Sequence, residues 1–234
     1  MEATIYLIPV PLGEAEHART FPAYNREVII SLKHFIVENV RTARRFLKKT
    51  VPSIIIDELH FSELNEHTSP EAIAGMLAPL ENGMSVGLMS EAGCPAVADP
   101  GADVVAIAQR KGYHVVPLVG PSSIVLALMA SGFNGQQFAF QGYLPVEATK
   151  RMERIKALEV RMYAENETQI FIETPYRNRK LLGDLIRACK PSTRLCVAAN
   201  ITCDDELIRT LPVKEWAKNL PDINRKPAIF LIGH

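Results

Sequence analysis

The sequence lacks an excess of charge of either sign. Lysine and arginine total 26 of the 234 residues, aspartate and glutamate also total 26, and the formal net charge is therefore zero. Such a chain has no overall electric field that attracts nucleic acid, so any RNA affinity must come from a local basic surface. With 47% hydrophobic and 22% charged residues, the composition is that of a soluble globular protein with one large or two modest domains.

Cysteines are few, and none has the spacing of a metal ligand. Cys94, Cys189, Cys196 and Cys203 form no C-x-x-C pair, so the sequence indicates neither a zinc site nor a disulfide framework. We therefore expect reduced thiols in a cytoplasmic protein, with no bound metal.

Long hydrophobic runs and the usual dinucleotide-binding motif are also missing. The most apolar region, residues 115–130, is interrupted by Pro117, Gly120 and Pro121, which argues against a membrane span. The first residues carry no basic segment, so no signal peptide is expected. Because no G-x-G-x-x-G occurs, an ordinary Rossmann cofactor site has no support.

The segment that is present and organises the chain is the loop of residues 90–101, SEAGCPAVADPG. It follows an apolar run, residues 84–89, that predicts a buried strand. It precedes a helix for which Asp99 suits the N-cap and Pro100 the first helical position. A loop of small residues at the carboxyl end of a strand is where open α/β sheets bind cofactors, so we predict one wall of a cofactor site here.

The first half of the chain alternates regularly between strand and helix patterns. The predicted strands are residues 4–10, 35–37, 54–56, 84–89 and 115–119, and the predicted helices are residues 26–32, 41–49, 99–111 and one opened by Ser69 and Pro70. This alternation predicts an α/β fold in which a mostly parallel sheet carries helices on both faces. We expect an N-terminal αβα domain at residues 1–119.

The second half alternates less regularly. Its predicted strands are residues 138–144, 168–173, 194–202, 206–210 and 228–232, and its predicted helices are residues 149–163, 177–189 and 213–220. Several of these strands lack a crossover helix long enough for parallel pairing, so we expect a mixed sheet in a C-terminal αβα domain, residues 120–234.

The turn at residues 120–123, GPSS, leads into a helix that is apolar on all sides. Ser122 or Ser123 can cap this helix, residues 124–130, which we expect to be buried. Its free N–H groups could hold a polar ligand atom. A plain capped core helix explains the same residues and is the simpler interpretation of the turn alone.

Five segments of the chain occur together in the order found in one family. They are LIPVPLG at residues 7–13, SEAGCP with DPG within residues 90–101, PLVGPSS at 117–123, FQGYLP at 140–145 and IFIETPYR at 170–177. These segments resemble motifs of the tetrapyrrole methylase superfamily, in its ribosomal RNA small subunit methyltransferase I branch. The similarity covers nearly the whole chain.

The resemblance implies a homodimer of two αβα domains that binds S-adenosyl-L-methionine in the cleft between the domains and needs no metal. It also implies which residues contact the cofactor through backbone and small side chains. These residues are Leu12, Gly93, Cys94, Val97, Ser122, Ser123, Ile124, Ile172 and Ala228.

The chain departs from that branch at positions expected to face the acceptor. Where the family has E-D-T-R-H-T, residues 38–43 are ENVRTA, so Asn39 and Thr42 replace the family residues. Where the family has the pair R-E, this chain has Ala199 and Asn200. Where the family has R-K-G-E, residues 225–228 are RKPA. The resemblance therefore supports the methyl donor more strongly than it supports ribosomal RNA as the acceptor.

The resemblance implies 2′-O-methylation of a cytidine ribose in small-subunit ribosomal RNA, a reaction in which a base helps to remove the hydroxyl proton. The candidate catalytic residues are Glu91 in the central loop, Glu173 at a strand end and Glu38, which a plain ion pair with Arg41 would also explain. Two alternatives stay open, a methylase of a small tetrapyrrole-like molecule and a cofactor-binding relative without catalysis.

Two basic helices, residues 41–49 and 149–163, could line a groove for RNA phosphates. Each also has the pattern of an ordinary solvated amphipathic helix, and the second carries acidic residues in balance. No aromatic residues are interleaved with the basic ones for base stacking. RNA as a partner is therefore an expectation that comes from the resemblance.

Overall fold

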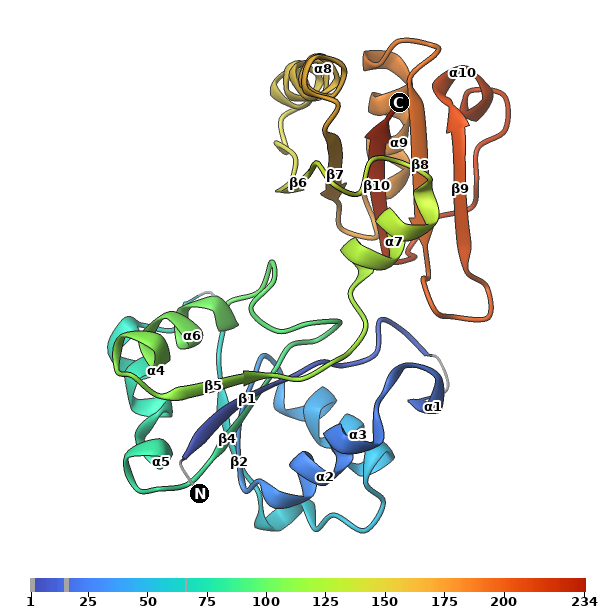
Figure 1. The fold of residues 1–234 in the computed structure, drawn as a ribbon. Coiled ribbons are helices and arrows are strands. Elements are labelled where there is room, and N and C mark those ends of the chain that lie inside the picture. Colours follow the sequence, from blue (N-terminus) through green and yellow to red (C-terminus); the bar gives the residue numbers. More distant parts are fainter. Residues whose placement is uncertain (1–2, 15–16, 66) are drawn as a thin grey trace. The chain divides into compact units, whose positions relative to one another are not determined.

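The computed structural model describes residues 3–14, 17–65 and 67–234. The chain divides into two compact units, Met1–Ser122 and Ser123–His234. Figure 1 shows the elements of both units, and each unit is described by itself below. None of the helices in the described ranges has the length and apolar character needed to cross a membrane.

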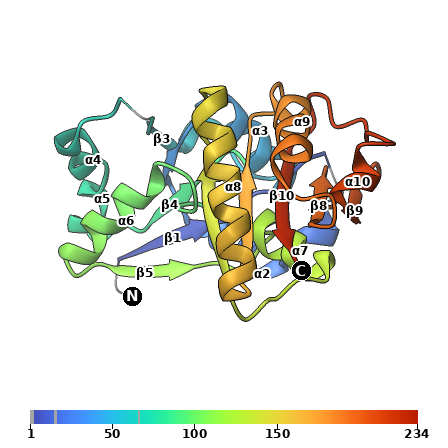
Figure 2. The ribbon, with the colours of Figure 1, turned by 90° about the horizontal axis from the view of Figure 1, so that it is seen from above.

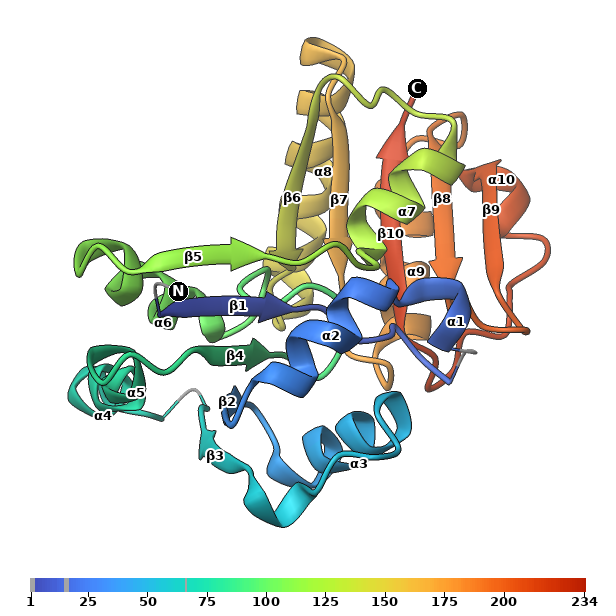
Figure 3. The ribbon, with the colours of Figure 1, turned by 60° about the horizontal axis from the view of Figure 1, so that its bottom comes forward.

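The first unit is built on a five-stranded parallel sheet with the order β3-β2-β4-β1-β5, which Figure 3 shows edge to edge. The strands are β1 (Thr4–Ile8), β2 (His34–Val37), β3 (His60–Glu63), β4 (Val86–Met89) and β5 (His114–Pro117). The helical segments are α1 (His17–Thr20), α2 (Ala23–Ser31), α3 (Val40–Thr50), the 3₁₀ turn η1 (Ile56–Glu58), α4 (Pro70–Met76), α5 (Ala78–Glu81) and α6 (Gly101–Arg110).

Two buried clusters cover the two faces of this sheet. Side chains of α2 and α3, such as Ile29 and Leu47, pack on one face, and side chains of α4 and α6, such as Ile73 and Val104, pack on the other. The central strand β4 is buried along its whole length, as parallel sheets covered on both faces require. The predicted parallel α/β sheet with helices on both faces is confirmed.

The second unit has a five-stranded mixed sheet with the order β6-β7-β10-β8-β9. The strands are β6 (Phe138–Tyr143), β7 (Thr168–Ile172), β8 (Arg194–Ala199), β9 (Leu207–Pro212) and β10 (Ala228–Gly233), and the helices are α7 (Ser123–Ser131), α8 (Ala148–Glu165), α9 (Asn178–Ala188) and α10 (Val213–Trp216). Only β6 and β7 pair in parallel, and the other pairs are antiparallel. The predicted mixed sheet is confirmed.

The helices of the second unit lie on both faces of its sheet. Helices α8, α9 and α10 contribute to one core that also holds Phe171, Phe230 and Trp216. Figure 2 shows α8 and α9 next to each other, and the two helices are in contact. Helix α7 packs against β9 and β10, on the face opposite to α9 in Figure 3.

One predicted strand, residues 54–56, is wrong. Ile56 begins a 3₁₀ turn, and the strand of this region is β3, which begins at His60. β3 is an edge strand with half-exposed side chains, so it has no apolar pattern. Backbone bonds to the chain around β2 flank it, from the His60 N–H to the Lys33 carbonyl and from the Leu64 N–H to the Val37 carbonyl, both 2.8 Å long.

The expectation of a fully buried helix after the GPSS turn is also wrong. In α7 only Ala127, Leu128 and Ser131 are buried, whereas Val125 is 49% and Met129 is 74% exposed. The reason is that α7 packs one side against β9 and β10, so side chains on its other side stay partly exposed.

Candidate functional site at the carboxyl edge of the first sheet

Three loops meet where β1, β4 and β5 end. Because parallel strands end at the same edge of a sheet, the loops after them come together there. The Val10 N–H donates to the Gly93 carbonyl at 2.9 Å, and the Gly93 N–H donates to the Val10 carbonyl at 3.1 Å. The Cys94 thiol lies 3.4 Å from the carbonyl oxygen of Pro121. The structure thus brings the predicted residues Gly93 and Cys94 against both neighbouring loops.

Two glycines allow this close approach. Gly93 has φ +75°, and a Cβ there would lie 3.2 Å from the Leu12 side chain. A Cβ on Gly120 would lie 2.3 Å from Cβ of Pro9, which is impossible without separating the two loops. The predicted cofactor residue Leu12 is therefore in the same cluster as Gly93.

The central loop, residues 90–101, is locally strained. Ala96 and Ala98 have φ of 67° and 56°, a region that residues with a Cβ rarely adopt and that is often found at functional sites. Val97 between them is 50% exposed, so the predicted cofactor residue presents an apolar side chain to the surface of the unit.

Asp99 holds this loop and also accepts a bond at the start of the next helix. Its Oδ1 accepts hydrogen bonds from the N–H groups of Ala96, at 2.9 Å, and Gly101, at 2.7 Å. Helix α6 begins at Gly101, and Pro100 in its N-cap position makes no side-chain capping bond. The helix thus begins two residues after the predicted start at Asp99, but the predicted contact is present, since Asp99 Oδ1 accepts from the N–H of the first helical residue.

Three carboxyl groups, Glu38, Glu91 and Asp99, form what we call the acid cluster. Glu38 follows β2 and Glu91 follows β4, and the Glu91 N–H donates to Glu38 Oε1 at 3.0 Å. Burial, then the hydrogen bond with Asp99 and the negative charges of Asp99 and Glu91, raise the pKa of Glu38 to about 7. A protonated Glu38 can donate to Asp99, whose buried Oδ2 otherwise lacks a donor among the described residues.

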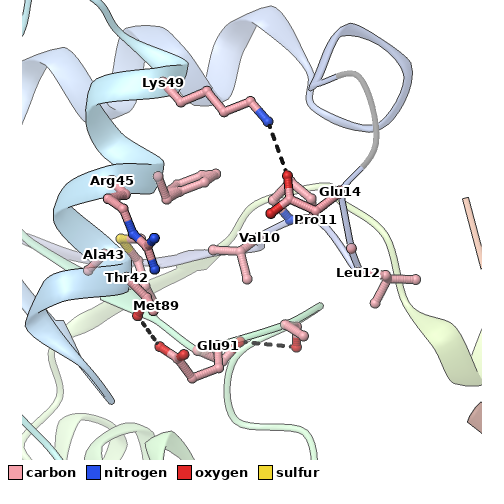
Figure 4. Close-up of a pocket in the computed structure, with 14 residues that line it drawn as sticks. Val10, Pro11, Leu12, Glu14, Thr42, Ala43, Arg45, Lys49, Met89 and Glu91 are labelled. Atoms are coloured by element: carbon pink, nitrogen blue, oxygen red, sulfur yellow. Dashed lines mark hydrogen bonds and ion pairs between the residues drawn. The ribbon is translucent and has the colours of Figure 1, made fainter. Parts of the chain in front are cut away.

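A pocket of about 380 Å³, the Glu91 pocket, opens beside this cluster (Figure 4). At one end the Thr42 hydroxyl donates to Glu91 Oε1 at 2.5 Å. At the other end Lys49 lies 4.0 Å from Glu14, and Arg45 extends from α3 toward the Thr42 end. The remaining lining residues are Val10, Pro11, Leu12, Gly13, Ala43, Phe46, Met89, Ser90 and Ala92. The pocket therefore places two carboxylates, Glu14 and Glu91, and two cations around a partly apolar space.

The other predicted residues lie in the second unit, at one end of its sheet. Ile172 pairs with Ile229, the residue after Ala228. The far end of α7 is fixed near the opposite end of β10, because Phe133 packs over Gly233. The start of α7 therefore lies toward the end of the sheet where β10 begins, and Figure 1 shows α7 running in this direction. Ser123 and Ile124 are its first two residues. That these residues share one cofactor with the first unit stays a prediction.

Glu173 has a geometry that differs from that of the other two candidate acids. It is buried, Arg177 Nη2 lies 2.6 Å from its Oε1, and the Thr174 N–H donates to the same oxygen at 2.7 Å. Both contacts come from the same short segment, so they fix the carboxylate of Glu173 within its own loop. Its catalytic role stays a prediction, and the contacts favour a structural ion pair.

Sequence reasoning missed Asp99 as a member of the acid cluster. The only local signal was an acid flanked by small residues between Ala98 and Gly101. The thiol of Cys94 has a pKa raised by burial, which makes it a packing group rather than a nucleophile. In the described ranges no group of three histidine, cysteine or acidic side chains is placed to hold a metal ion.

Comparisons with known proteins agree on one family. The model of the family described as Tetrapyrrole (Corrin/Porphyrin) Methylases matches residues 4–217. The chain is 29% identical to ribosomal RNA small subunit methyltransferase I of Escherichia coli O157:H7, over 100% of this chain and 79% of that protein. It is 33% identical to the protein of the same name from Mesorhizobium japonicum, over 90% of this chain and 67% of that protein.

Solved structures of methyltransferases show the same fold. The methyltransferase CobJ superposes with a TM-score of 0.65 at 14% identity, over 99% of this chain and 93% of that one. A uroporphyrin-III-C-methyltransferase from Thermus thermophilus superposes with a TM-score of 0.57 at 19% identity, over 100% of this chain and 93% of that one. The two-unit α/β architecture is therefore a known one.

Proposed function

Because the chain belongs to the tetrapyrrole methylase family, we propose that it methylates the ribose 2′-hydroxyl of a cytidine in small-subunit ribosomal RNA. It is an S-adenosylmethionine-dependent methyltransferase. The observation that carries the proposed acceptor is the similarity, along nearly the whole chain, to proteins named for ribosomal RNA methylation. An acceptor of this kind would meet the enzyme in the cytoplasm.

The residues of the first unit fit S-adenosylmethionine. Gly93 and Gly120 allow the three loops to lie close together. The apolar side chains of Val97 and Val119 are exposed at the same edge of the sheet, and that of Val119 is 78% exposed. Apolar side chains suit a purine ring, and loop backbone suits the polar groups of the ligand. When bound, the cofactor supplies a methyl group on a positively charged sulfur. We propose that Leu12, Gly93, Cys94, Val97 and Ser122 of the first unit and Ser123, Ile124, Ile172 and Ala228 of the second hold it.

Glu91 is the proposed base for the acceptor hydroxyl. It is exposed and lines the pocket, and the Thr42 hydroxyl and the backbone bond to Glu38 fix its position. A base held at hydrogen-bond distance from the reacting hydroxyl removes its proton as the new bond forms. Glu38 and Asp99 position Glu91 indirectly, because they hold the central loop through hydrogen bonds.

A homodimer is part of the proposal. Val125 and Met129 give α7 an exposed apolar side within the second unit, which a second copy of the chain would cover. Sedimentation equilibrium at micromolar concentration tests this point. A monomer that binds and turns over the cofactor would refute the dimer and leave the activity intact.

The proposed acceptor is tested with small ribosomal subunits from a strain that lacks the enzyme. Wild-type protein with radioactive S-adenosylmethionine is expected to label these subunits, and primer extension at low nucleotide concentration is expected to show one new stop at a cytidine. Absence of both signals in the presence of bound cofactor would remove ribosomal RNA as the acceptor.

The role of Glu91 is tested by Glu91→Gln, which keeps an acceptor for Thr42 but cannot take a proton. We expect the methylation rate to fall by about 10²–10⁴-fold, with unchanged cofactor affinity in calorimetry. Glu153→Gln, which changes an exposed glutamate of α8, is the matched control and is expected to retain full activity. A mild loss for both variants would show that Glu91 is not the base.

A further inference from the structure

Helix α3 concentrates positive charge in a chain whose net charge is zero. Its sequence, VRTARRFLKKT, contains five cations and no acid. Ala43, Leu47 and Thr50 are buried against the unit, and all five cations are exposed. We call these five side chains the α3 basic face, and they are Arg41, Arg44, Arg45, Lys48 and Lys49.

Part of this face has no internal counter-charge. Arg44 is paired with Asp57 at 2.7 Å, and Lys49 lies 4.0 Å from Glu14. For Arg41 and Arg45, no carboxylate in the described part of the chain lies within ion-pair distance. Unpaired exposed arginines in a row are suited to bind the phosphates of another molecule, since a planar guanidinium can bind phosphate with two hydrogen bonds.

The basic helix α8 of the second unit differs in this respect. Lys150 lies 3.0 Å from Glu147, and Arg161 lies 3.0 Å from Glu165. Arg151 is buried against Asp184. Three of the five cations of α8 are thus paired with acids of the same unit, Arg154 donates to Gln141, and the helix itself carries three acids. Because α3 carries no acid, α8 offers the weaker site for an external polyanion.

Three cavities adjoin one another along α3. The Glu91 pocket, of 380 Å³, includes Arg45 and Lys49. A second cavity, of 580 Å³, is lined by Arg41, Arg44 and Arg45 together with one acid, Glu63. A third, of 490 Å³, is lined by Arg44, Arg45 and Lys48 together with Asp57, the partner of Arg44. Since Arg45 borders all three, they form a track along the helix whose one end lies at Glu91.

We propose that the α3 basic face binds the phosphates of a single RNA strand and leads the acceptor nucleotide into the Glu91 pocket. This inference rests on the proposed function. The length of the track favours an extended polyanion over a compact acid, because the eleven residues of α3 span roughly 16 Å. A single strand fits better than a duplex, because a nucleotide must leave its stack to enter a pocket of this size.

The test variant is Arg41→Gln with Arg45→Gln, which removes two cations and breaks no ion pair. Binding of decauridine and of small ribosomal subunits is measured against salt concentration. For decauridine we expect weaker binding and a salt slope reduced by about 1.4, because each lost phosphate contact on a single strand contributes about 0.7. Calorimetry is expected to show unchanged affinity for S-adenosylmethionine.

The matched control is Arg110→Gln with Lys214→Gln, which removes two exposed cations from α6 and α10. It is expected to bind RNA and methylate subunits as the wild type does. An equal loss of RNA binding in this control would overturn the proposal. It would also be overturned if the double variant Lys150→Gln with Lys156→Gln on α8 lost RNA binding and the α3 variant did not.

Two further outcomes separate the proposals from each other. If the wild type methylates subunits but the α3 variant keeps the full salt slope, the track is wrong and the function stands. If the wild type neither binds nor methylates RNA but binds uroporphyrin, a polycarboxylate, and the α3 variant loses that binding, the face serves a small acid and both proposals fall.

Discussion

At the scale of single residues, the acid cluster sets the electrostatics of the site. Glu38, Glu91 and Asp99 lie close enough that three negative charges would repel one another strongly. A proton shared between Glu38 and Asp99 removes one of these charges and satisfies the buried Oδ2 of Asp99. Of the three carboxyl groups, Glu91 is the one whose side chain lines the pocket.

The proton on Glu38 predicts how stability depends on pH. The pKa of Glu38 rises from an ordinary value of 4.5 to about 7 on folding, so the folded protein holds more protons than the unfolded chain between these values. The stability that this proton contributes is complete below pH 4.5 and is lost as the pH rises to about 7.

Glu38→Gln tests this prediction, because the amide keeps an acceptor for the Glu91 N–H and a donor for Asp99 at every pH. In thermal melts from pH 4.5 to 8, the melting temperature of the variant is expected to rise relative to the wild type until about pH 7 and then to stay level. Glu63→Gln, which removes an exposed carboxylate at the end of β3, controls for lost charge. A constant difference across this range would mean that Glu38 is ionised throughout.

A second residue-scale prediction concerns Gly120. A Cβ there overlaps Pro9, so Gly120→Ala must separate two of the loops that form the candidate cofactor site. We expect a loss of about 1–3 kcal/mol in unfolding free energy, together with weaker binding of S-adenosylmethionine in calorimetry. Gly75→Ala is the control in the same unit, since a Cβ at Gly75 meets nothing within 4 Å. Equal behaviour of both variants would show that the loops need no close contact.

At the scale of elements, α8 and α9 are joined by a buried ion pair. Arg151 Nε donates to Asp184 Oδ2 at 2.7 Å, and its Nη1 donates to the carbonyls of Pro145 and Val146. Both charged side chains are 3% exposed. Removing one partner of such a pair leaves an uncompensated buried charge, which is more costly than the loss of an exposed pair.

Arg151→Ala is therefore expected to destabilise the protein by about 3 kcal/mol in urea unfolding. Arg161→Ala, which breaks an exposed pair with Glu165 on the same helix, is expected to cost less than about 1 kcal/mol. Comparable losses for the two variants would show that burial of the pair contributes nothing measurable.

At the scale of the whole molecule, each unit has its own core. The first unit contains a buried cluster on each face of its sheet, and the second contains a cluster around Phe171, Phe230 and Trp216. Units with separate cores can unfold independently. A ligand that binds both units is therefore expected to slow hydrogen exchange in both.

Hydrogen exchange with S-adenosylmethionine tests the proposed involvement of both units. At a ligand concentration a hundred times its dissociation constant, binding stabilises the folded state by about 2.7 kcal/mol. We expect slower exchange at the ends of β1 and β4 in the first unit and of β7 and β10 in the second. S-adenosylhomocysteine, which lacks the methyl group and the positive charge on sulfur, serves as the comparison ligand. Protection confined to one unit would remove the residues of the other from the proposed site.

The sequence alone determined the kinds of elements and the type of each sheet. Alternation predicted four of the five strands of the first unit, all except β3. The Ser69–Pro70 signal was confirmed, because the Ser69 hydroxyl accepts a bond from the Ala72 N–H. These features are local, since capping and periodicity depend on residues a few positions apart. The half-exposed edge strand β3 and the exposed side of α7 were mispredicted because their burial depends on distant partners.

Only the tertiary structure decided which residues meet at the site. Glu38 and Glu91 are 53 residues apart in the chain, and they touch because β2 lies next to β4 in the sheet. The same strand order brings the loop after β1 against Gly93 and Pro9 against Gly120. A pattern along the chain can identify the loops that follow the strands, but the order of the strands in the sheet decides which of these loops become neighbours.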